Sequence, residues 1–377
     1  MTTGGGPRYD IPQHLLPADG RFGCGPSKVP AAALDQLAGP GRALLGTSHR
    51  QPPVKQLVER VQAGLGALFQ LPDGYEVVLG NGGTTVFWDM AALSLIERRS
   101  QHLVFGEFSA KFATVATEAP FLAEPEVIRS DPGSHPLPRA SSEVDAYCLT
   151  HNETSTGVAM TPGRTGTHGQ LVLVDATSAA GGLPVEVSAV DAYYFAPQKC
   201  FASEGGIWIA LLSPAALERL ERLETSGRWI PASLSLLNAV ENSRQHQTYN
   251  TPAIATLFLL AHQVDWLLEM GGLTWAVERS RTSARTIYQW AEARPWASPF
   301  VSDPEQRSSV VATIDLTDAV LAREVSAILR QNGVVDTDSY RKLGRNQLRL
   351  GLFPAVEPED VVQLTRSIDW VVEALTG

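Results

Sequence analysis

Two neighbouring segments decide the fold: Leu171–Ser178, with the sequence LVLVDATS, and Asp191–Lys199, with the sequence DAYYFAPQK. Each contains a short apolar run followed by turn residues, and such runs are typical of buried strands in a parallel sheet. The first run ends at Asp175 and the second is followed closely by Lys199. Functional groups of an open α/β sheet lie outside the carboxyl ends of its strands, so a carboxylate and an amine are expected there together.

A carboxylate beside an amine is the pair that pyridoxal phosphate (PLP) requires of a protein. The lysine forms the Schiff base with the cofactor, and the carboxylate pairs with the pyridinium nitrogen so that the ring accepts electrons. Taken alone, an aspartate and a lysine placed like Asp175 and Lys199 are more often a turn cap and an exposed loop lysine. The surrounding sequence therefore decides between the two interpretations.

The bulk composition describes an ordinary globular protein. The chain has 377 residues, which is longer than one hydrophobic core usually grows, so we expect two domains. Apolar residues make up 44% and charged residues 19% of the chain. The formal net charge of -10 argues against a nucleic-acid or anionic-membrane partner.

Cysteine usage and the N-terminal sequence point to the cytoplasm. Cys24, Cys148 and Cys200 lie far apart without metal-ligand spacing, which favours a reducing compartment and predicts no metal site. The N-terminus lacks the apolar core of a signal peptide. No apolar run approaches the roughly 18 residues that a membrane span requires. We therefore expect a cytoplasmic protein.

Strand and helix patterns alternate along the first two thirds of the chain. Apolar positions predict a helix over 54–68 and another over 84–96. This alternation predicts an α/β domain with a mainly parallel central sheet and helices on both faces. Strands are expected at 75–79, 102–105, 146–149, 171–174, 192–195 and 206–212.

The C-terminal part has a different pattern, typical of a compact α+β unit. Strands are expected at 310–316 and 347–353, with helices near 319–331 and 358–376. A helical region covers 252–285, and the Gly- and Pro-rich N-terminus is expected to be an arm rather than a core element. The expected domains are an arm at 1–25, a large domain at 26–264 and a small domain at 265–377.

The residues after each predicted strand suggest the parts of one site. Gly80–Thr85 offers free backbone N–H groups at a helix N-terminus, which suit a phosphate group. It lacks the full G-x-G-x-x-G pattern, so a dinucleotide site is less favoured. Phe108 is either a ring that stacks on a cofactor or a core residue. The polar run His151–Gly157 either bonds a ring hydroxyl or forms a capped loop.

Together these segments resemble the fold-type I PLP enzymes, and more narrowly the class V phosphoserine aminotransferases of actinobacterial type. The similarity covers nearly the whole chain and rests on six motifs in the expected order. They are Gly23-Cys24-Gly25-Pro26-Ser27, Gly46-Thr47-Ser48-His49-Arg50, His151-Asn152-Glu153-Thr154, Ala196-Pro197-Gln198-Lys199, Tyr249-Asn250-Thr251-Pro252 and Gln347-Leu348-Arg349.

The resemblance implies a role for each residue that meets the cofactor. Lys199 would hold PLP and move the proton, and Asp175 would keep the pyridinium proton. Phe108 would stack on the ring, where many family members have Trp, and Thr154 would bond the ring 3-oxygen. The cofactor phosphate would be bound by Gly83, Thr84 and Gln198, and by Asn250 and Thr251 of the other subunit of a homodimer.

The resemblance also implies the groups that bind substrate. Arg349 would bind the α-carboxylate, because only arginine gives a planar two-point bond. His49 and Arg50 would bind the phosphate of phosphoserine or the distal carboxylate of glutamate across the dimer interface. Arg341 would join them, with Lys342 and Arg345 as less certain members. Arginines at 341, 345 and 349 also fit a solvated helix face, although Gly344 and the alternating pattern after it favour a loop followed by a strand.

The activity implied is ping-pong transamination between O-phospho-L-serine with 2-oxoglutarate and 3-phosphohydroxypyruvate with L-glutamate. This reaction belongs to serine biosynthesis, and the phosphohydroxythreonine step of pyridoxine biosynthesis is a related candidate. One alternative is a class V enzyme of the serine- or alanine–glyoxylate type, for which His49 and Arg50 would be surplus. A cysteine desulfurase is disfavoured because the C-terminal region lacks a cysteine. A non-catalytic PLP- or nucleotide-binding module is the remaining alternative.

Overall fold

The computed structural model describes residues 9–167 and 169–377, and it contains the mainly parallel sheet that was expected. The strand order is β1-β9-β8-β7-β4-β2-β3. Strands β2, β3, β4, β7 and β8 pair in parallel, whereas β9 runs antiparallel to both of its neighbours. The bounds are β1 Glu76–Asn81, β2 Ser100–Val104, β3 Glu126–Arg129, β4 Ala146–Thr150, β7 Leu171–Asp175, β8 Ala192–Phe195 and β9 Ile207–Leu212.

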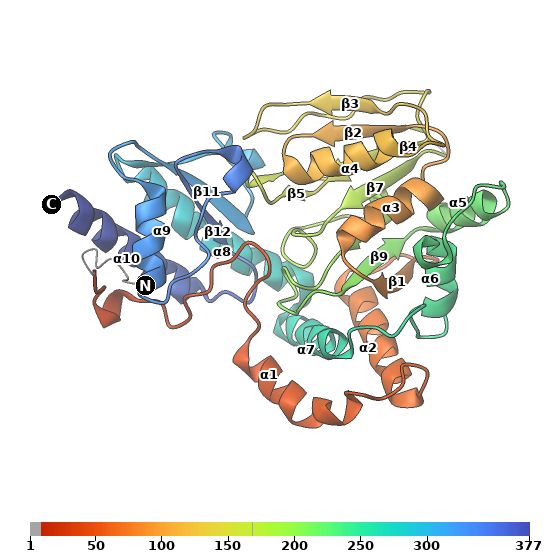
Figure 1. Cartoon of the computed structure of the whole chain (residues 1–377), viewed down its shortest axis with the longest axis horizontal. Coiled ribbons are helices and arrows are strands. Elements are labelled where there is room, and N and C mark those ends of the chain that lie inside the picture. The colour runs from red at the N-terminus through yellow and green to blue at the C-terminus, as the bar shows by residue number, and fades with distance from the viewer. Residues whose placement is uncertain (1–8, 168) are drawn as a thin grey trace, which may run out of the picture.

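Side chains that alternate along each strand divide between two cores, one on each face of this sheet. In β8, Tyr193 and Phe195 pack into the core under α2 and α7, and Ala192 and Tyr194 pack into the core under α3 to α6. Helices therefore cover both faces, as the alternating pattern predicted (Figure 1). Their bounds are α2 Pro52–Leu68, α3 Thr84–Ser94, α4 Glu107–Glu118, α5 Pro214–Glu224, α6 Leu236–Ser243 and α7 Ile254–Met270.

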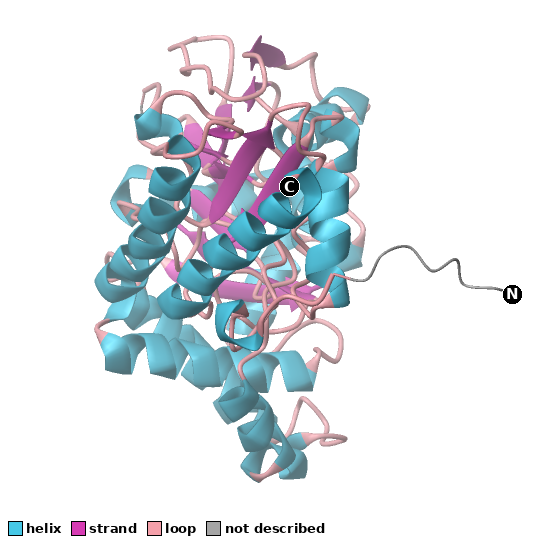
Figure 2. Ribbon diagram, turned by 90° about the vertical axis from the view of Figure 1, so that its left-hand side faces the viewer, coloured by secondary structure: helices cyan, strands magenta, loops and turns pink. Residues whose placement is uncertain are grey.

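The C-terminal part forms a smaller unit around a second sheet, in the antiparallel order β10-β11-β12. Long helices pack across these strands, as the view from that side shows (Figure 2). The unit has its own apolar core and is the α+β arrangement that the sequence predicted. Its elements are α8 Gly272–Glu292, β10 Ala297–Pro299, β11 Val311–Leu316, α9 Ala322–Gln331, β12 Gln347–Gly351 and α10 Pro358–Thr376.

Helix α8 connects the two units. Its residue Ala276 belongs to the core of the large unit, and Ile287, three turns later, belongs to the core of the small unit. The helical region expected over 252–285 is broken at Gly271, which ends α7 with a φ of 122°. The domain boundary near 265 stays a prediction, since the change of core falls within α8.

The N-terminal residues differ from the expected arm. Residues 1–8 lie outside the described residues, but Ile11 and Phe22 are buried in the core of the small unit. The backbone N–H of Phe22 donates to Val335, and its carbonyl accepts from Gly351 at 2.7 Å. Two apolar residues among glycines and prolines make no periodic pattern, so the sequence does not reveal this packing. The remaining short elements are α1 Ala31–Ala38, β5 Asn152–Glu153, β6 Val158–Ala159 and 3-10 turns at Gln13–Leu15, Pro40–Leu44, Val187–Ala189, Ala232–Leu234, Pro304–Gln306 and Arg341–Leu343.

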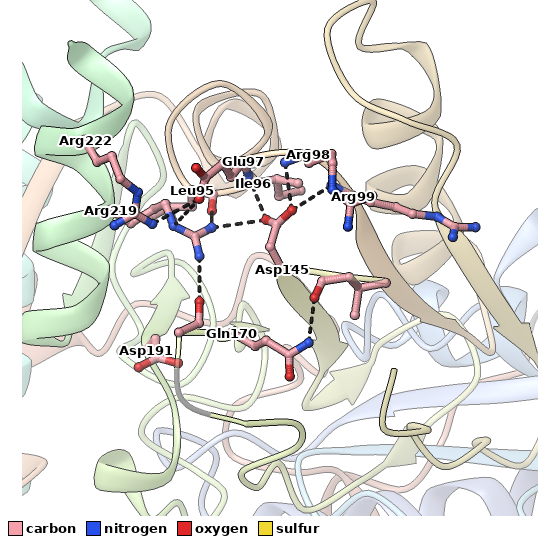
Figure 3. A network of polar contacts seen from close by, with 12 residues as sticks. Leu95, Ile96, Glu97, Arg98, Arg99, Asp145, Gln170, Asp191, Arg219 and Arg222 are labelled. Carbon is pink, nitrogen blue, oxygen red and sulfur yellow. Dashed lines mark hydrogen bonds and ion pairs between the residues drawn. The ribbon is translucent and has the colours of Figure 1, made fainter. Parts of the chain in front are cut away.

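A partly buried polar network ties the elements together at the amino ends of the strands. Asp145, just before β4, accepts hydrogen bonds from the backbone N–H groups of residues 97–99 at 2.7 to 2.8 Å. It also accepts from the guanidinium of Arg219 in α5 at 3.1 Å (Figure 3). Because this network lies before the strands and polar ligand-binding groups come after them, we assign it to folding rather than to a site. Among the described helices, none is long and apolar enough to cross a membrane.

Candidate active site

The carboxyl ends of the parallel strands open into one cavity between α3, α4 and the strand ends. Asp175 ends β7, Thr150 ends β4, and Lys199 lies just after β8. The sequence placed these positions at one sheet edge, and the fold brings their side chains to a common space. The cavity is lined by Thr84, Thr85, Trp88, Phe108, Thr150, Asn152, Thr154, Asp175, Thr177, Gln198 and Lys199.

Lys199 is held in place by the turn at Cys24 and Gly25. Its Nζ donates to the Cys24 carbonyl at 2.7 Å. Burial lowers the pKa of Lys199 to about 8, and the positive charge of Arg349 acts in the same direction. With this pKa the protonated amine predominates near physiological pH, but a minor neutral fraction is present. A neutral amine is the form that attacks a carbonyl and accepts a proton.

Asp175 lies in the same cavity as a buried carboxylate with several donors. Thr177 donates to Oδ1 through its backbone N–H at 2.9 Å and its hydroxyl at 2.5 Å. The indole Nε1–H of Trp88 donates to Oδ2 at 2.8 Å. The pKa of Asp175 is raised overall, because burial outweighs the hydrogen bonds from Thr177 and Trp88 that lower it. The donors thus favour the ionised carboxylate against the cost of burial.

The glycine turn before α3 leaves an anion-binding helix end open to the cavity. Gly83 is the N-cap of α3, and no side chain among the described residues caps the first N–H groups of this helix. A β-carbon on Gly83 would meet nothing within 4 Å, so there is space beside these groups. Thr84 begins the helix and lines the cavity. Across it, the amide oxygen of Gln198 is buried without a described partner.

These features fit PLP. The uncapped helix end suits the phosphate of the cofactor, and a turned Gln198 carboxamide would offer it an N–H donor. Lys199 supplies the amine and Asp175 supplies an acceptor for a ring nitrogen. Sites for the two ends of the cofactor are therefore present around one cavity.

Phe108 lies in the first turn of α4, where Glu153 fixes it. The buried Glu153 carboxylate accepts from the backbone N–H groups of Phe108 at 3.1 Å and Ser109 at 2.9 Å. A β-carbon on Gly106 would lie 2.3 Å from the Glu153 side chain, so only glycine fits this approach. The polar run around Glu153 is therefore partly a helix cap, a role that the sequence analysis missed.

Thr154 and Asn152 come after β4 and share one partner. The Thr154 hydroxyl lies 2.7 Å from Ser178 Oγ, and the Asn152 Nδ2 donates to the same oxygen at 2.9 Å. Asn152 Oδ1 is buried without a described partner. This side of the cavity therefore has unused hydrogen-bonding capacity for a ring substituent. Ser178, which organises it, was not singled out from the sequence.

Arg349 approaches the cavity from the small unit. It lies on β12 between the buried Leu348 and Leu350, so the strand pleat turns it away from that core. Its Nη1 donates to the Thr154 carbonyl at 3.3 Å, and its guanidinium lies 5.2 Å from the centre of the Tyr340 ring. Its Nε is buried and has no partner among the described residues. The strand position confirms the loop-then-strand interpretation and excludes a shared helix face.

The other cations of this segment are differently engaged. Arg345 pairs with Asp315, and its guanidinium lies 4.6 Å from the Phe300 ring centre. Lys342 pairs with Glu107 at the start of α4, which links the small unit to the large one. Arg341 is exposed in a 3-10 turn, Arg341–Leu343. The two less certain substrate-binding residues, Lys342 and Arg345, therefore already have carboxylate partners.

His49, Arg50, Asn250 and Thr251 form a second group that does not line the cavity of the same chain. His49 Nδ1 lies 3.1 Å from Thr251 Oγ1. Arg50 donates to Gln247 Oε1 at 2.7 Å, and Asn250 N–H donates to Asn81 at the end of β1 at 3.3 Å. Burial and the neighbouring Arg50 lower the pKa of His49. One chain therefore brings these four residues together, but not to Lys199.

Two contacts of the cavity were missed in the sequence although a signal exists. Trp88 lies four residues after Thr84, which places both on one face of α3. Thr177 lies two residues after Asp175, the spacing of a side-chain turn. Among residues 9–167 and 169–377, no group of three or more potential metal ligands gathers.

Comparison with known proteins agrees with this architecture. The profile of the class-V aminotransferases matches residues 22–337, which is more than half of the chain. The chain therefore belongs to the class-V aminotransferase family, whose chemistry requires PLP, so the predicted cofactor and enzyme class are confirmed.

Relatives narrow the family further. The phosphoserine aminotransferase of Nocardioides sp. is 61% identical, over 97% of this chain and 98% of the relative. The phosphoserine aminotransferase of Rhodococcus opacus is 60% identical, over 97% of this chain and 98% of the relative. The structure of a phosphoserine aminotransferase from Cytophaga hutchinsonii superposes with a TM-score of 0.86 at 24% identity, covering 93% of this chain and 99% of that one. Within class V, the chain belongs to the phosphoserine aminotransferases, as the six motifs indicated.

Proposed function

We propose that this protein transfers the amino group of L-glutamate to 3-phosphohydroxypyruvate, giving 2-oxoglutarate and O-phospho-L-serine. The observation that carries the proposal is the meeting of Lys199 and Asp175 in one cavity, with Arg349 bonded to its wall at Thr154. The identity of about 60% to phosphoserine aminotransferases supports the choice of substrate. Bound PLP supplies the electron sink that lets an amino acid lose its Cα proton.

Each chain residue then has a defined task. Lys199, with its lowered pKa, accepts the Cα proton at Nζ and returns it to the carbon on the other side of the transferred nitrogen. Asp175 would accept the hydrogen bond of the protonated ring nitrogen. The α3 amide groups at Gly83 and Thr84, with Gln198, bind the phosphate, and Phe108 covers the ring. Thr154 bonds the ring oxygen.

Two anionic ends must be bound in each substrate. Arg349 meets the α-carboxylate, because its buried Nε and its planar guanidinium offer a two-point bond. His49, Arg50 and Arg341 meet the distal phosphate or carboxylate. An alanine–glyoxylate enzyme has no distal anion to bind, so this second set of hydrogen-bond donors, two of them arginines, favours the phosphoserine reaction over that alternative.

The distal-anion set implies a homodimer. His49 and Arg50 contact Thr251 and Gln247 and do not line the Lys199 cavity, and Asn250 is exposed beside them. A second copy that turns this edge toward the first copy's cavity would complete both sites, as a two-fold axis requires. Mixing inactive Lys199→Ala chains with inactive Arg50→Ala chains tests this. About half of the mixed dimers are hybrids, and each hybrid holds one intact site of two, so about a quarter of the wild-type activity should return. No recovery of activity would contradict shared sites.

We also propose that the enzyme works in the cytoplasm. The phosphohydroxythreonine step of pyridoxine biosynthesis is a second candidate reaction, since that substrate also carries a phosphate at the far end from its amino group. Comparing kcat/KM for the two phosphorylated substrates would rank them, and equal values would assign both.

The visible spectrum of the purified protein tests the main proposal. The absorption band of the lysine-bound cofactor should be present and should bleach when O-phospho-L-serine is added, but not with L-alanine. Bleaching by alanine alone would keep the fold and reject the substrate. A colourless protein that cannot be reconstituted with PLP would reject the whole proposal.

A further inference from the structure

The bonds around Asp175 leave a single direction for a ligand. An ionised carboxylate offers about four lone-pair positions. Thr177 occupies two on Oδ1, and the indole of Trp88 occupies one on Oδ2. The position that remains is on Oδ2, and Asp175 lines the cavity. The oxygen that meets a ring nitrogen is therefore the one that Trp88 also holds.

The indole of Trp88 is itself held firmly. Trp88 is buried, and its ring stacks on Phe112 with centroids 6.2 Å apart. It lies one turn after Thr84 on α3, the helix whose first turn faces the cavity. Because the ring is packed, its N–H direction is set by the fold and not by the ligand.

The hydroxyl of Thr177 also has a forced direction. It lies 2.5 Å from Asp175 Oδ1 and 2.9 Å from Thr84 Oγ1, but it has one hydrogen to donate. A carboxylate accepts only, so the Thr177 hydrogen goes to Asp175 and the Thr84 hydroxyl donates to Thr177. The chain of hydroxyls from Thr84 therefore runs toward the carboxylate. Thr84 then binds an anion through its backbone N–H.

Some charged and titratable neighbours raise the pKa of Asp175, and others lower it. Glu153 and burial raise the pKa of Asp175, whereas Lys199 is a nearby positive group when protonated. Tyr193 and Tyr194 on β8 are buried beside it, and their own pKa values are raised, so they stay neutral. The neutral donors Trp88 and Thr177 are thus a main support of the ionised form.

We propose that Trp88 is a positioning residue which, together with Thr177, keeps Asp175 ionised and directs its free Oδ2 lone pair at the ring nitrogen of the cofactor. The inference rests on PLP as cofactor in the proposed function and assigns a specific task to a residue outside the six motifs. Without the indole donor, the shared proton shifts from the ring nitrogen to the carboxylate, and the ring becomes a weaker electron sink.

The test is nitrogen NMR of resting protein loaded with PLP labelled at the ring nitrogen, recorded across pH without substrate. In Trp88→Phe, which keeps an aromatic ring and removes the donor, the ring nitrogen should lose its proton about 10-fold more readily. Trp208→Phe is the matched control, because Trp208 is equally buried but packs its ring edge-on against Phe87. Its spectrum should match that of the wild type.

A second variant and the single-turnover rate distinguish a positioning role of Trp88 from a role in folding alone. Thr177→Val, nearly the same shape, removes the hydroxyl donor to Oδ1 and should shift the ring nitrogen in the same direction. In both variants the single-turnover rate with amino donor should fall about 10-fold while KM changes little. A ring nitrogen that titrates like the wild type in both would overturn the proposal. Wild-type protein that holds no PLP would instead reject the proposed function before any variant is compared.

Discussion

A β-carbon built on Gly25 would lie 1.7 Å from Nζ of Lys199. The glycine also has a φ of 134°, a backbone conformation that side chains other than glycine rarely adopt. The preceding residue, Cys24, provides the carbonyl that accepts the Lys199 hydrogen bond. The N-terminal segment, which packs on the small unit, thus determines where the amine of the large unit stands.

Replacing Gly25 by alanine should displace the lysine and remove the absorption band of lysine-bound PLP. Gly227→Ala is the matched control, because Gly227 also has positive φ, at 82°, but nothing lies within 4 Å of an added carbon. The control should cost about 1 kcal/mol of unfolding free energy and keep the band. Urea unfolding and the visible spectrum measure both effects. A Gly25→Ala protein with an unchanged band would show that Lys199 tolerates the intrusion.

Arg349→Lys should weaken the binding of every amino-acid substrate. Lysine keeps the charge but loses the planar two-point bond, so KM for glutamate and phosphoserine should rise together by about 10- to 100-fold. Arg345→Lys is the control, because Arg345 is already paired with Asp315. Steady-state kinetics on both substrates distinguish the two positions, and equal effects would remove Arg349 from its assigned task.

The reactivity of Lys199 in cofactor-free protein should reflect its lowered pKa. Burial brings that pKa from 10.5 down to about 8, so the amine is protonated below pH 8 and neutral above it. Lys342 provides an internal reference, since Glu107 raises its pKa. Competitive acetylation with mass-spectrometric readout should therefore show Lys199 reacting at lower pH than Lys342. The reverse order would mean that the amine is solvated when the cofactor is absent.

Glu153→Gln should destabilise the fold and disturb the position of Phe108. Glu153 accepts from donors on Phe108, Ser109 and Ser155, and an amide would turn an N–H2 group toward some of them. A buried donor left without a partner costs about 1–3 kcal/mol. Glu118→Gln, exposed at the other end of α4, should leave the unfolding free energy nearly unchanged. If both variants unfold alike, the cap is not needed.

The predicted architecture came from local patterns that the fold preserves. The last helix occupies 358–376 as expected, because its apolar residues recur at the helical period. Strand β8 occupies 192–195 as expected, because its uniform apolar run indicates burial. Short strand β3 and helices α1, α5 and α6 were not predicted. Strand β3 is only partly buried and carries charged residues at Glu126 and Arg129, so its apolar signal is weak.

The candidate site likewise contains residues that the sequence predicted and residues that it did not. Asp175 and Lys199 lie just beyond consecutive buried strands, and strand order in a parallel sheet carries them to one cavity. Trp88, Glu153 and Gly25 act through contacts with residues far away in sequence, so no local pattern reveals their partners. Their residue types alone are compatible with a core, a surface cap and a turn.

The sequence by itself determined the α/β class through its apolar periodicity and the amine–carboxylate pair through the residue types at the strand ends. It indicated the family through the resemblance of its six motifs. Only the tertiary structure decided how the pair is controlled. It placed the Trp88 donor on Asp175, the Cys24 carbonyl on Lys199 and the Arg349 strand against the cavity wall. Hydrogen bonds and burial act over a few ångströms in space. The residues that they join are far apart in the sequence, so the pattern of a single segment does not predict these contacts.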